Sequence, residues 1–243
     1  AYLREETEKT KVLIAQPLVN RIKDMREPVK NWADIEFSCF SQWGDDGIIQ
    51  YLINKIPGLH PSFIEFGVSN YLESNTRFLL MNNNWRGLIL DGSQQNIDFI
   101  RNDSVSWKYD LTATCLFITR SNINQAISQA GFSGKTGIMH IDIDGNDYWL
   151  WDAVNAVDPQ IVIMEYNSLF GSKHAISVPY QDDFFVTHAH HSNIFFGASL
   201  PAMNHLAMQK GYVFVGSNTA GNNAYFVKSE LINEWVKPVA TED

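Results

Sequence analysis

The stretch that decides the fold is Ser62-Phe63-Ile64-Glu65-Phe66-Gly67, and Arg86-Gly87-Leu88-Ile89-Leu90-Asp91 repeats its pattern further along the chain. Each is a short apolar run that ends in an acidic residue, with a glycine beside the acid or just ahead of the run. This pattern is typical of a buried parallel strand that carries a carboxylate to the carboxyl edge of a sheet. Two such strands in succession predict a nucleoside cofactor across their ends, with an acid on its ribose.

The segment after the first strand favours a cofactor that has no pyrophosphate. Asp91 follows Gly67 at roughly the 20-residue spacing of the dinucleotide fingerprint. However, Gly67-Val68-Ser69-Asn70-Tyr71-Leu72 contains only the first glycine of that fingerprint. The missing glycines are those that let a pyrophosphate approach the backbone closely. S-adenosylmethionine carries no phosphate, so the sequence favours methyl transfer over its alternative, a nicotinamide-dependent oxidoreductase.

Composition narrows the class of protein. The chain has 243 residues, of which 45% are hydrophobic and 13% aromatic, enough for a sizeable core. Its net charge of −9 argues against nucleic acid as the main partner. Cys39 and Cys115 show no metal or redox spacing, which fits reduced thiols in a cytoplasmic protein. No apolar run reaches the roughly 18–20 residues of a membrane span, and no signal peptide is expected.

Periodicity predicts strands that alternate with helices behind an N-terminal helical extension, residues 1–39. Strands are expected at about 62–67, 87–91, 104–109, 137–142, 160–165, 212–215 and 224–227, and helices at about 45–56, 73–82, 94–101, 121–130, 147–156 and 199–209. The last two strands flank Gly221-Asn222-Asn223, which predicts a hairpin. The fold class is therefore α/β: a Rossmann-like seven-stranded class I methyltransferase sheet with one antiparallel C-terminal strand. Residues 40–243 are expected to form this single domain, with 167–197 as a substrate-covering segment.

An ordered set of motifs resembles the FkbM-type methyltransferases, in particular the bacterial branch found with surface-glycan biosynthesis. The motifs are Phe40–Ile49, Phe63–Gly67, Ser74-Asn75-Thr76, Trp85–Gly92, His140–Trp149, Glu165-Tyr166-Asn167, Phe196–Leu200 and Gly221–Val227. The resemblance implies a Rossmann-like enzyme that uses S-adenosylmethionine, most often to methylate a hydroxyl of a sugar or related metabolite. The chain departs from the commonest form of the family at Ser69-Asn70-Tyr71, where a glycine turn is usual.

The cofactor is expected to lie on the acids that end the first two strands. Glu65, beside Phe66 and Gly67, is expected near the methionine ammonium; otherwise it caps the next helix or pairs with Arg77. Asp91, followed by Gly92, is expected to accept hydrogen bonds from both ribose hydroxyls, a task that suits a carboxylate.

Further cofactor contacts are expected from polar residues on neighbouring loops. Gln42, Ser74 and Asn75 are candidates for the methionine carboxylate, although all could be helix caps. Asp110, which would follow the third strand, is a candidate for the adenine amino group. Asp142, at the end of the fourth strand, completes the expected cofactor set.

The richest local signal is the acidic loop Asp142-Ile143-Asp144-Gly145-Asn146-Asp147. Its acids repel one another unless a cation or a substrate amine compensates. Asp144, Glu165 and Asn167 could form an oxygen-rich site for Mg²⁺. Without a metal, Asp144 would act as general base or acceptor-binding residue. Asp147 could simply be the first-turn acid of the next helix.

The segment 167–197 holds four of the seven histidines, namely His174, His188, His190 and His191. A histidine over the cleft could remove a proton from the acceptor, and His174 or His190 is the preferred candidate.

The sequence therefore predicts O-methylation of a small-molecule or carbohydrate acceptor. N-methylation of an amino-sugar or amino-alcohol and a non-catalytic binding protein on the same fold are the remaining alternatives. The acceptor, the oligomeric state (a homodimer is one option) and the role of residues 1–39 are left open by the sequence.

Overall fold

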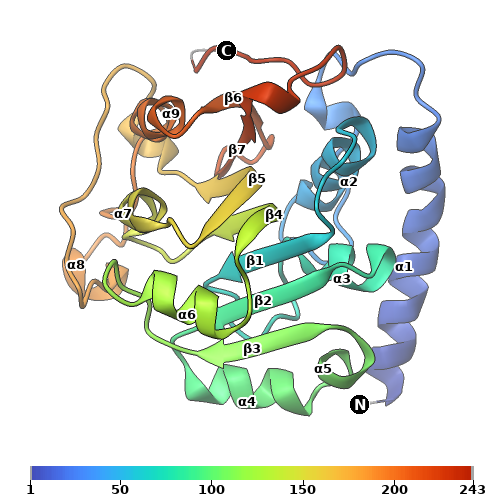
Figure 1. Ribbon diagram of the computed structural model, residues 1–243, viewed down its shortest axis with the longest axis horizontal. Helices are drawn as coiled ribbons and strands as arrows, with labels where there is room; N and C mark the ends of the chain where they lie inside the picture. The colour runs from blue at the N-terminus through green and yellow to red at the C-terminus, as the bar shows by residue number, and fades with distance from the viewer. Residues whose placement is uncertain (1, 242–243) are drawn as a thin grey trace.

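The computed structural model describes residues 2–241, which form one seven-stranded sheet in the order β3-β2-β1-β4-β5-β7-β6 (Figure 1). The strands are β1 (Ser62–Phe66), β2 (Arg86–Asp91), β3 (Leu111–Cys115), β4 (Gly134–Ile141), β5 (Val157–Glu165), β6 (Tyr212–Ser217) and β7 (Asn223–Lys228). Strands β1 to β5 pair in parallel, whereas β7 lies antiparallel between β5 and β6. The predicted fold class and its antiparallel C-terminal strand are confirmed.

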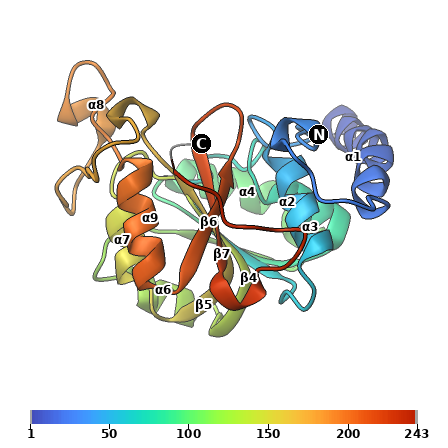
Figure 2. The same ribbon diagram turned by 90° about the horizontal axis from the view of Figure 1, so that it is seen from above.

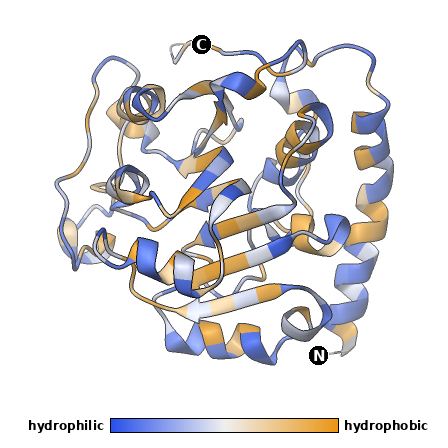
Figure 3. Ribbon diagram, viewed as in Figure 1, coloured by the Kyte–Doolittle hydropathy of each residue, from blue (hydrophilic) through white to orange (hydrophobic). Residues whose placement is uncertain are grey.

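Helices cover both faces of the sheet (Figure 2). The longer ones are α1 (Tyr2–Lys23), α2 (Asp45–Lys55), α3 (Arg77–Asn83), α4 (Gln94–Asn102), α6 (Ile123–Gln129), α7 (Asp147–Ala153) and α9 (Leu200–Gln209), and two single turns are α5 (Val105–Lys108) and α8 (Val186–Ala189). Helices α6, α7 and α9 pack on one face of the sheet, and α2, α3, α4 and α5 on the other. The strands between these layers are mainly apolar (Figure 3), because helices on both faces of a parallel sheet bury the side chains on both sides of each strand.

Helix α1 forms an outer layer against α2 and α3 (Figures 1 and 2). Ala15 and Val19 of α1 pack with Phe40 and Phe78, and Ile22 joins the main core. The predicted N-terminal extension is thus a helix that shares a hydrophobic core with the sheet. Among residues 2–241, no helix combines the length and the apolar character of a membrane span.

The predicted third strand at 104–109 is wrong. Residues Val105–Lys108 form helix α5, and the strand is β3, Leu111–Cys115. β3 is an edge strand that pairs only with β2, and all its residues are half-buried, so it lacks the apolar run that marks the central strands. The expected helix at 73–82 also begins later, at Arg77, because Ser69 and Tyr71 adopt positive φ and the chain loops before it.

Candidate functional site

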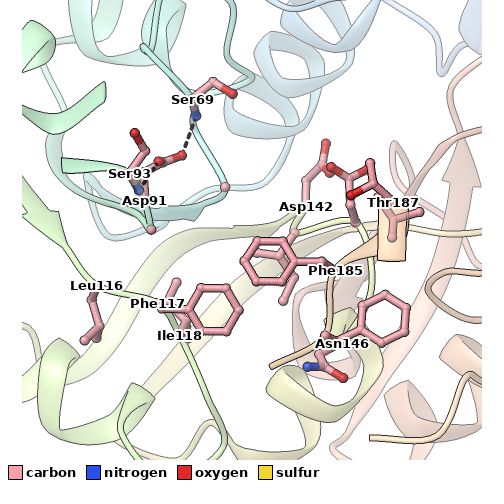
Figure 4. Close-up of a pocket in the computed structure, with 16 residues that line it drawn as sticks. Ser69, Asp91, Ser93, Leu116, Phe117, Ile118, Asp142, Asn146, Phe185 and Thr187 are labelled. Atoms are coloured by element: carbon pink, nitrogen blue, oxygen red, sulfur yellow. Dashed lines mark hydrogen bonds between the residues drawn. The ribbon is translucent and has the colours of Figure 1, made fainter. Parts of the chain in front are cut away.

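A cavity of about 450 Å³ lies at the carboxyl edge of the sheet, beside the ends of β1, β2, β3 and β4 (Figure 4). Residues 184–187, which include the start of α8, also line the cavity. The lining residues are Gly67, Ser69, Asp91, Gly92, Ser93, Leu116, Phe117, Ile118, Asp142, Ile143, Asp144, Asn146, Phe184, Phe185, Val186 and Thr187. This is the position at which open α/β sheets bind their ligands.

Gly67 brings the end of β1 against the end of β4. Its φ is +77°, and a Cβ there would lie 1.6 Å from the carbonyl oxygen of Asp142. Only glycine fits a backbone contact this close. Two residues later, the amide of Ser69 donates to Asp91 Oδ2 at 2.8 Å (Figure 4). The loop after β1 is therefore tied to the ends of β4 and β2.

Asp91, the last residue of β2, presents a carboxylate at the cavity wall. Its Oδ2 accepts from Ser69, and its Oδ1 accepts from the amide of Ser93 at 2.8 Å and from Asn96 Nδ2 at 3.1 Å. A carboxylate has about four lone-pair sites, so these bonds fix its orientation and leave acceptor capacity free. Gly92, which follows it, also lines the cavity.

Aromatic and aliphatic side chains form the wall beyond Asp91. The rings of Phe117 and Phe185 lie 5.2 Å apart with an interplanar angle of 34° (Figure 4). Phe117 follows β3, whereas Phe185 belongs to the covering segment. That segment is anchored to the α7 region, because Trp149 Nε1 donates to Val178 O and Asn146 Nδ2 donates to Gln181 O. The two rings pack against each other and form an apolar wall, on which a flat aromatic group could stack.

Three carboxylates gather at the other end of the cavity. One oxygen of each of Asp142, Asp144 and Glu165 lies within 4.8 Å of the other two. Asp144 has a left-handed backbone, φ +54°, which is uncommon for a residue other than glycine. Glu165 Oε2 is buried and has no hydrogen-bond partner among the described residues. An orphaned buried carboxylate oxygen is costly, so this geometry fits a missing cation or donor.

The electrostatics of this acidic cluster follow from burial and mutual repulsion. Burial raises the pKa of Asp142 to about 6, and the charge of Asp144 adds to the effect of burial. Burial and the charges of Asp142 and Asp147 raise the pKa of Glu165 well above its ordinary value. Burial also raises the pKa of Asp144. Without a compensating charge, burial and mutual repulsion therefore favour the protonated forms of these acids.

Asp147 has a local structural role. It lies in the first turn of α7 and accepts from the amides of Ile143 at 2.8 Å and Gly145 at 2.9 Å. Burial and the charge of Asp142 raise its pKa to about 7. Asp147 is therefore a first-turn acid of α7, which is the alternative role that the sequence offered for it.

Glu65 does not line the cavity, contrary to the expectation that it holds the cofactor. It is 3% exposed and accepts from Ser74 Oγ at 2.6 Å, from the amide of Asn75 at 3.1 Å and from Thr76 Oγ1. His140 Nδ1 lies 2.9 Å from its other side. These donors occupy the carboxylate, so Glu65 organises the loop before α3. The alternative pairing of Glu65 with Arg77 is also wrong, because Arg77 bonds Glu8.

Several other expected cofactor contacts lie elsewhere. Ser74 and Asn75 are buried on Glu65, and the Phe66 side chain packs in the core. Gln42 is exposed and does not line the cavity. Asp110 precedes β3 instead of following it, so it lies at the amino edge of the sheet, opposite the cavity. The misplaced third strand explains that error.

On the acceptor side, Asn167 is not available to a metal. Its Nδ2 donates to Ile194 O and Phe196 O, and its Oδ1 accepts from the amide of Leu169. Asp142 occupies the position in the cluster that was expected for Asn167. His174 and His190 are exposed and do not line the cavity, so the structure does not bring a histidine base to it.

The sequence analysis did not place the Phe117–Phe185 pair at the cavity, and it missed one polar residue. Phe117 lies two residues after the end of β3, and a correct third strand would have placed it at the carboxyl edge. Phe185 lies in the aperiodic segment 167–197, whose aromatic side chains could equally pack on a ligand or in the core. Asn223 was expected only as a turn residue, but it is the first residue of β7 and the register partner of Glu165.

Comparison with known proteins gives the following. No family model matches the chain, and no curated protein sequence matches it. Among solved structures, an O-methyltransferase from Bacillus cereus in complex with SAH aligns at 11% identity and a TM-score of 0.48, over 90% of this chain and 91% of that one.

Two more solved structures align at a similar level. One is a SAM-dependent methyltransferase from Geobacter sulfurreducens in complex with S-adenosyl-L-homocysteine, at 14% identity and a TM-score of 0.42, over 82% of this chain and 72% of that one. The other is the N-terminal domain of EvdMO1 in the presence of SAH and D-fucose. It aligns at 11% identity and a TM-score of 0.44, over 87% of this chain and 94% of that one. Similarities this distant carry no information about the chemistry of this chain.

Proposed function

We propose that this protein is an S-adenosylmethionine-dependent methyltransferase. The observation that carries the proposal is the chemistry of the cavity wall. It presents the Asp91 carboxylate and an apolar wall, and the residues that line it within 2–241 include no Lys, Arg or His. A dinucleotide would need donors or close backbone approach for its pyrophosphate. S-adenosylmethionine needs a ribose acceptor, an adenine slot and carboxylates near its positive charges.

The residues fit this cofactor as follows. Asp91 would accept from the ribose hydroxyls with the lone pairs that its three donors leave free. The adenine ring would stack on the apolar wall that Phe117 and Phe185 form. Asp142, beside Gly67, replaces Glu65 as the carboxylate nearest to the methionine ammonium. The cofactor supplies an activated methyl group when bound, and the chain supplies orientation.

We further propose that the acceptor is a hydroxyl of a sugar or related metabolite, in keeping with the FkbM-type motifs of the sequence. The acidic cluster adjoins the cavity at Asp142 and Asp144, where an acceptor would meet the methyl group. The bound cofactor would supply the methyl group to the acceptor oxygen and would leave as the neutral thioether. In the metal-free case, Asp144, the most exposed of the three acids, would take the hydroxyl proton.

A divalent cation such as Mg²⁺ also fits the acidic cluster. The fit rests on Asp142, Asp144 and Glu165, with the orphaned Glu165 Oε2 as the observation that favours an added ligand. Such a cation, when bound, supplies a Lewis acid that lowers the pKa of the acceptor hydroxyl. The three carboxylates would hold it, and its charge would offset their mutual repulsion.

Two alternative activities, N-methylation and oxidoreduction, would use the same cavity differently. N-methylation is favoured by the acidic cluster itself, because three carboxylates would attract an ammonium acceptor without any metal. An oxidoreductase receives less support. The chain has a Tyr-x-x-x-Lys spacing at Tyr51 and Lys55, but Tyr51 donates its hydroxyl to Trp235 O and neither residue lines the cavity.

The test is calorimetric titration of the protein with S-adenosylhomocysteine, with NAD as the comparison ligand. We expect micromolar binding of the first and none of the second. Asp91→Ala should weaken binding by roughly 10- to 100-fold, since hydrogen bonds to a charged group are each worth about 1.5–3 kcal/mol. Asp98→Ala, which removes an exposed acid from α4, is the control and should bind normally. Binding of NAD alone, or equal affinities in the two variants, would overturn the proposal.

A further inference from the structure

Two buried oxygens without partners lie opposite each other on neighbouring strands. Glu165 is the last residue of β5 and Asn223 the first residue of β7, and they are register partners in the antiparallel ladder. Glu165 Oε2 and Asn223 Oδ1 are both buried without a hydrogen-bond partner among the described residues. Buried acceptors are nearly always satisfied, so two orphans on one pair point to a shared missing ligand.

The orientation of the Asn223 amide is fixed by its neighbour. Asn223 is 3% exposed, and its Nδ2 donates to Asp45 Oδ1 at 3.1 Å. Asp45 Oδ1 accepts this hydrogen bond, so the amide nitrogen of Asn223 faces Asp45. The amide oxygen is therefore directed away from Asp45. Asp45 is itself held by the hydroxyl of Tyr225 and by Asn218 Nδ2.

The sheet brings this oxygen to the acidic cluster. Directly opposed residues of an antiparallel pair have side chains on the same face, with Cβ atoms about 4.5–5.5 Å apart. Asp142 follows β4, whose last residue, Ile141, is paired with Met164, so Asp142 comes next to Glu165 on the other side. Glu165 is thus flanked by Asp142 on one strand and by Asn223 on the other.

We propose that Asn223 Oδ1 is a neutral oxygen ligand of a divalent cation that Asp142, Asp144 and Glu165 hold, with Asp45 as the positioning residue that keeps this oxygen directed at the site. The inference rests on the proposed function only in using the same acidic cluster. Amide carbonyls are regular ligands of hard cations. A neutral ligand at this position adds coordination without a fourth negative charge in a buried site. The Asp45 bond prevents the amide from turning its nitrogen toward the cation.

The experiment measures Mn²⁺ and Mg²⁺ binding by calorimetry in the absence of any S-adenosyl compound. Water-proton relaxation of the bound Mn²⁺ gives a second readout, the number of exchangeable waters on the metal. Asn223→Ala should lower the affinity about tenfold or more and add one exchangeable water. Asn54→Ala is the matched control: it removes a half-buried amide of α2 whose Nδ2 donates to Gln50 O and which takes no part in the proposed site, so affinity and hydration should stay as in the wild type.

A second variant separates a ligand from a merely structural residue. Asn223→Asp puts an additional carboxylate beside Asp45, so it should destabilise the cation-free protein, yet it should bind Mn²⁺ at least as tightly as the wild type. Equal losses of affinity in Asn223→Ala and Asn54→Ala, or unchanged hydration in Asn223→Ala, would overturn the role of Asn223. Failure of the wild type to bind either metal would overturn the cation site, while S-adenosylhomocysteine binding tests the methyltransferase proposal separately.

Discussion

The Glu65 carboxylate lies 2.9 Å from Nδ1 of His140, its register partner on the adjacent strand β4, and the two side chains form a buried pair beneath the cavity. Although burial opposes each charge, the hydrogen bond and charge of the partner prevail: the pKa of His140 is raised and that of Glu65 is lowered. Both directions favour an ionised pair. Its role is to hold the loop before α3 through Ser74, Asn75 and Thr76.

Replacing Glu65 by Gln should therefore affect stability and not cofactor contacts. Breaking a buried pair from one side leaves an uncompensated charge on His140 and typically costs about 3–5 kcal/mol. Urea denaturation should show that loss, while S-adenosylhomocysteine binds the folded fraction with nearly wild-type affinity. A variant that keeps wild-type stability but no longer binds S-adenosylhomocysteine would instead show that Glu65 contacts the cofactor.

Helix α1 should prove necessary for the stability of the sheet domain. Arg77 is 1% exposed, and its Nη2 bonds both oxygens of Glu8 at 2.9 Å. Glu8→Ala leaves that guanidinium buried without its main partner, so we expect a loss of about 3–5 kcal/mol in the free energy of unfolding. The control is Glu6→Ala, which removes only a surface pair with Lys9 and should change stability by about 0.5 kcal/mol or less. Equal effects would contradict the anchoring role.

Gly67→Ala should damage both the fold and the cavity. Gly67 and Gly58 share positive φ values of +77° and +76°, but a Cβ meets the Asp142 carbonyl oxygen only at Gly67 and has open space at Gly58. Gly58→Ala should cost about 1–2 kcal/mol, the strain of a left-handed backbone. Gly67→Ala should cost about 3 kcal/mol or more, because overpacking adds to that strain. Thermal unfolding of the two variants measures the difference, and similar melting temperatures would refute the close contact.

The acidic cluster should make the cation-free protein less stable as pH rises from about 5 to about 8. The raised pKa values of Asp142, about 6, and Glu165 mean that the native state holds protons that unfolded carboxyls have already released. Asp147, with a pKa of about 7, acts in the same direction, and the charge of His140 opposes the shift of Asp142.

Melting temperatures across this pH range measure the effect. Glu165→Gln, which carries no titrating proton, should flatten the dependence, and Mg²⁺ affinity of the wild type should rise with pH as protons leave. A wild-type curve that rises toward pH 8 without metal would contradict the assigned pKa directions.

The sequence by itself determined the succession of buried strands and the acids at their ends. Apolar runs such as Phe63-Ile64 and Leu88-Ile89-Leu90 favour a parallel sheet that is covered on both faces, and Asp91 then lies at its carboxyl edge. The edge strand β3 was misplaced because half-buried residues carry a weak periodic signal, and Asp110 was misassigned with it.

Only the tertiary structure decided which of these acids faces the cavity. Glu65 and Asp91 look alike in sequence, but His140, 75 residues away, and the loop before α3 enclose Glu65. Likewise, Asn167 is occupied by local carbonyls, while Asp142 and Asn223 flank Glu165 from neighbouring strands. Periodicity assigns a side chain to a face of the sheet. Whether a carboxylate there is satisfied or remains free for a ligand depends on donors from distant parts of the chain, which only packing brings together.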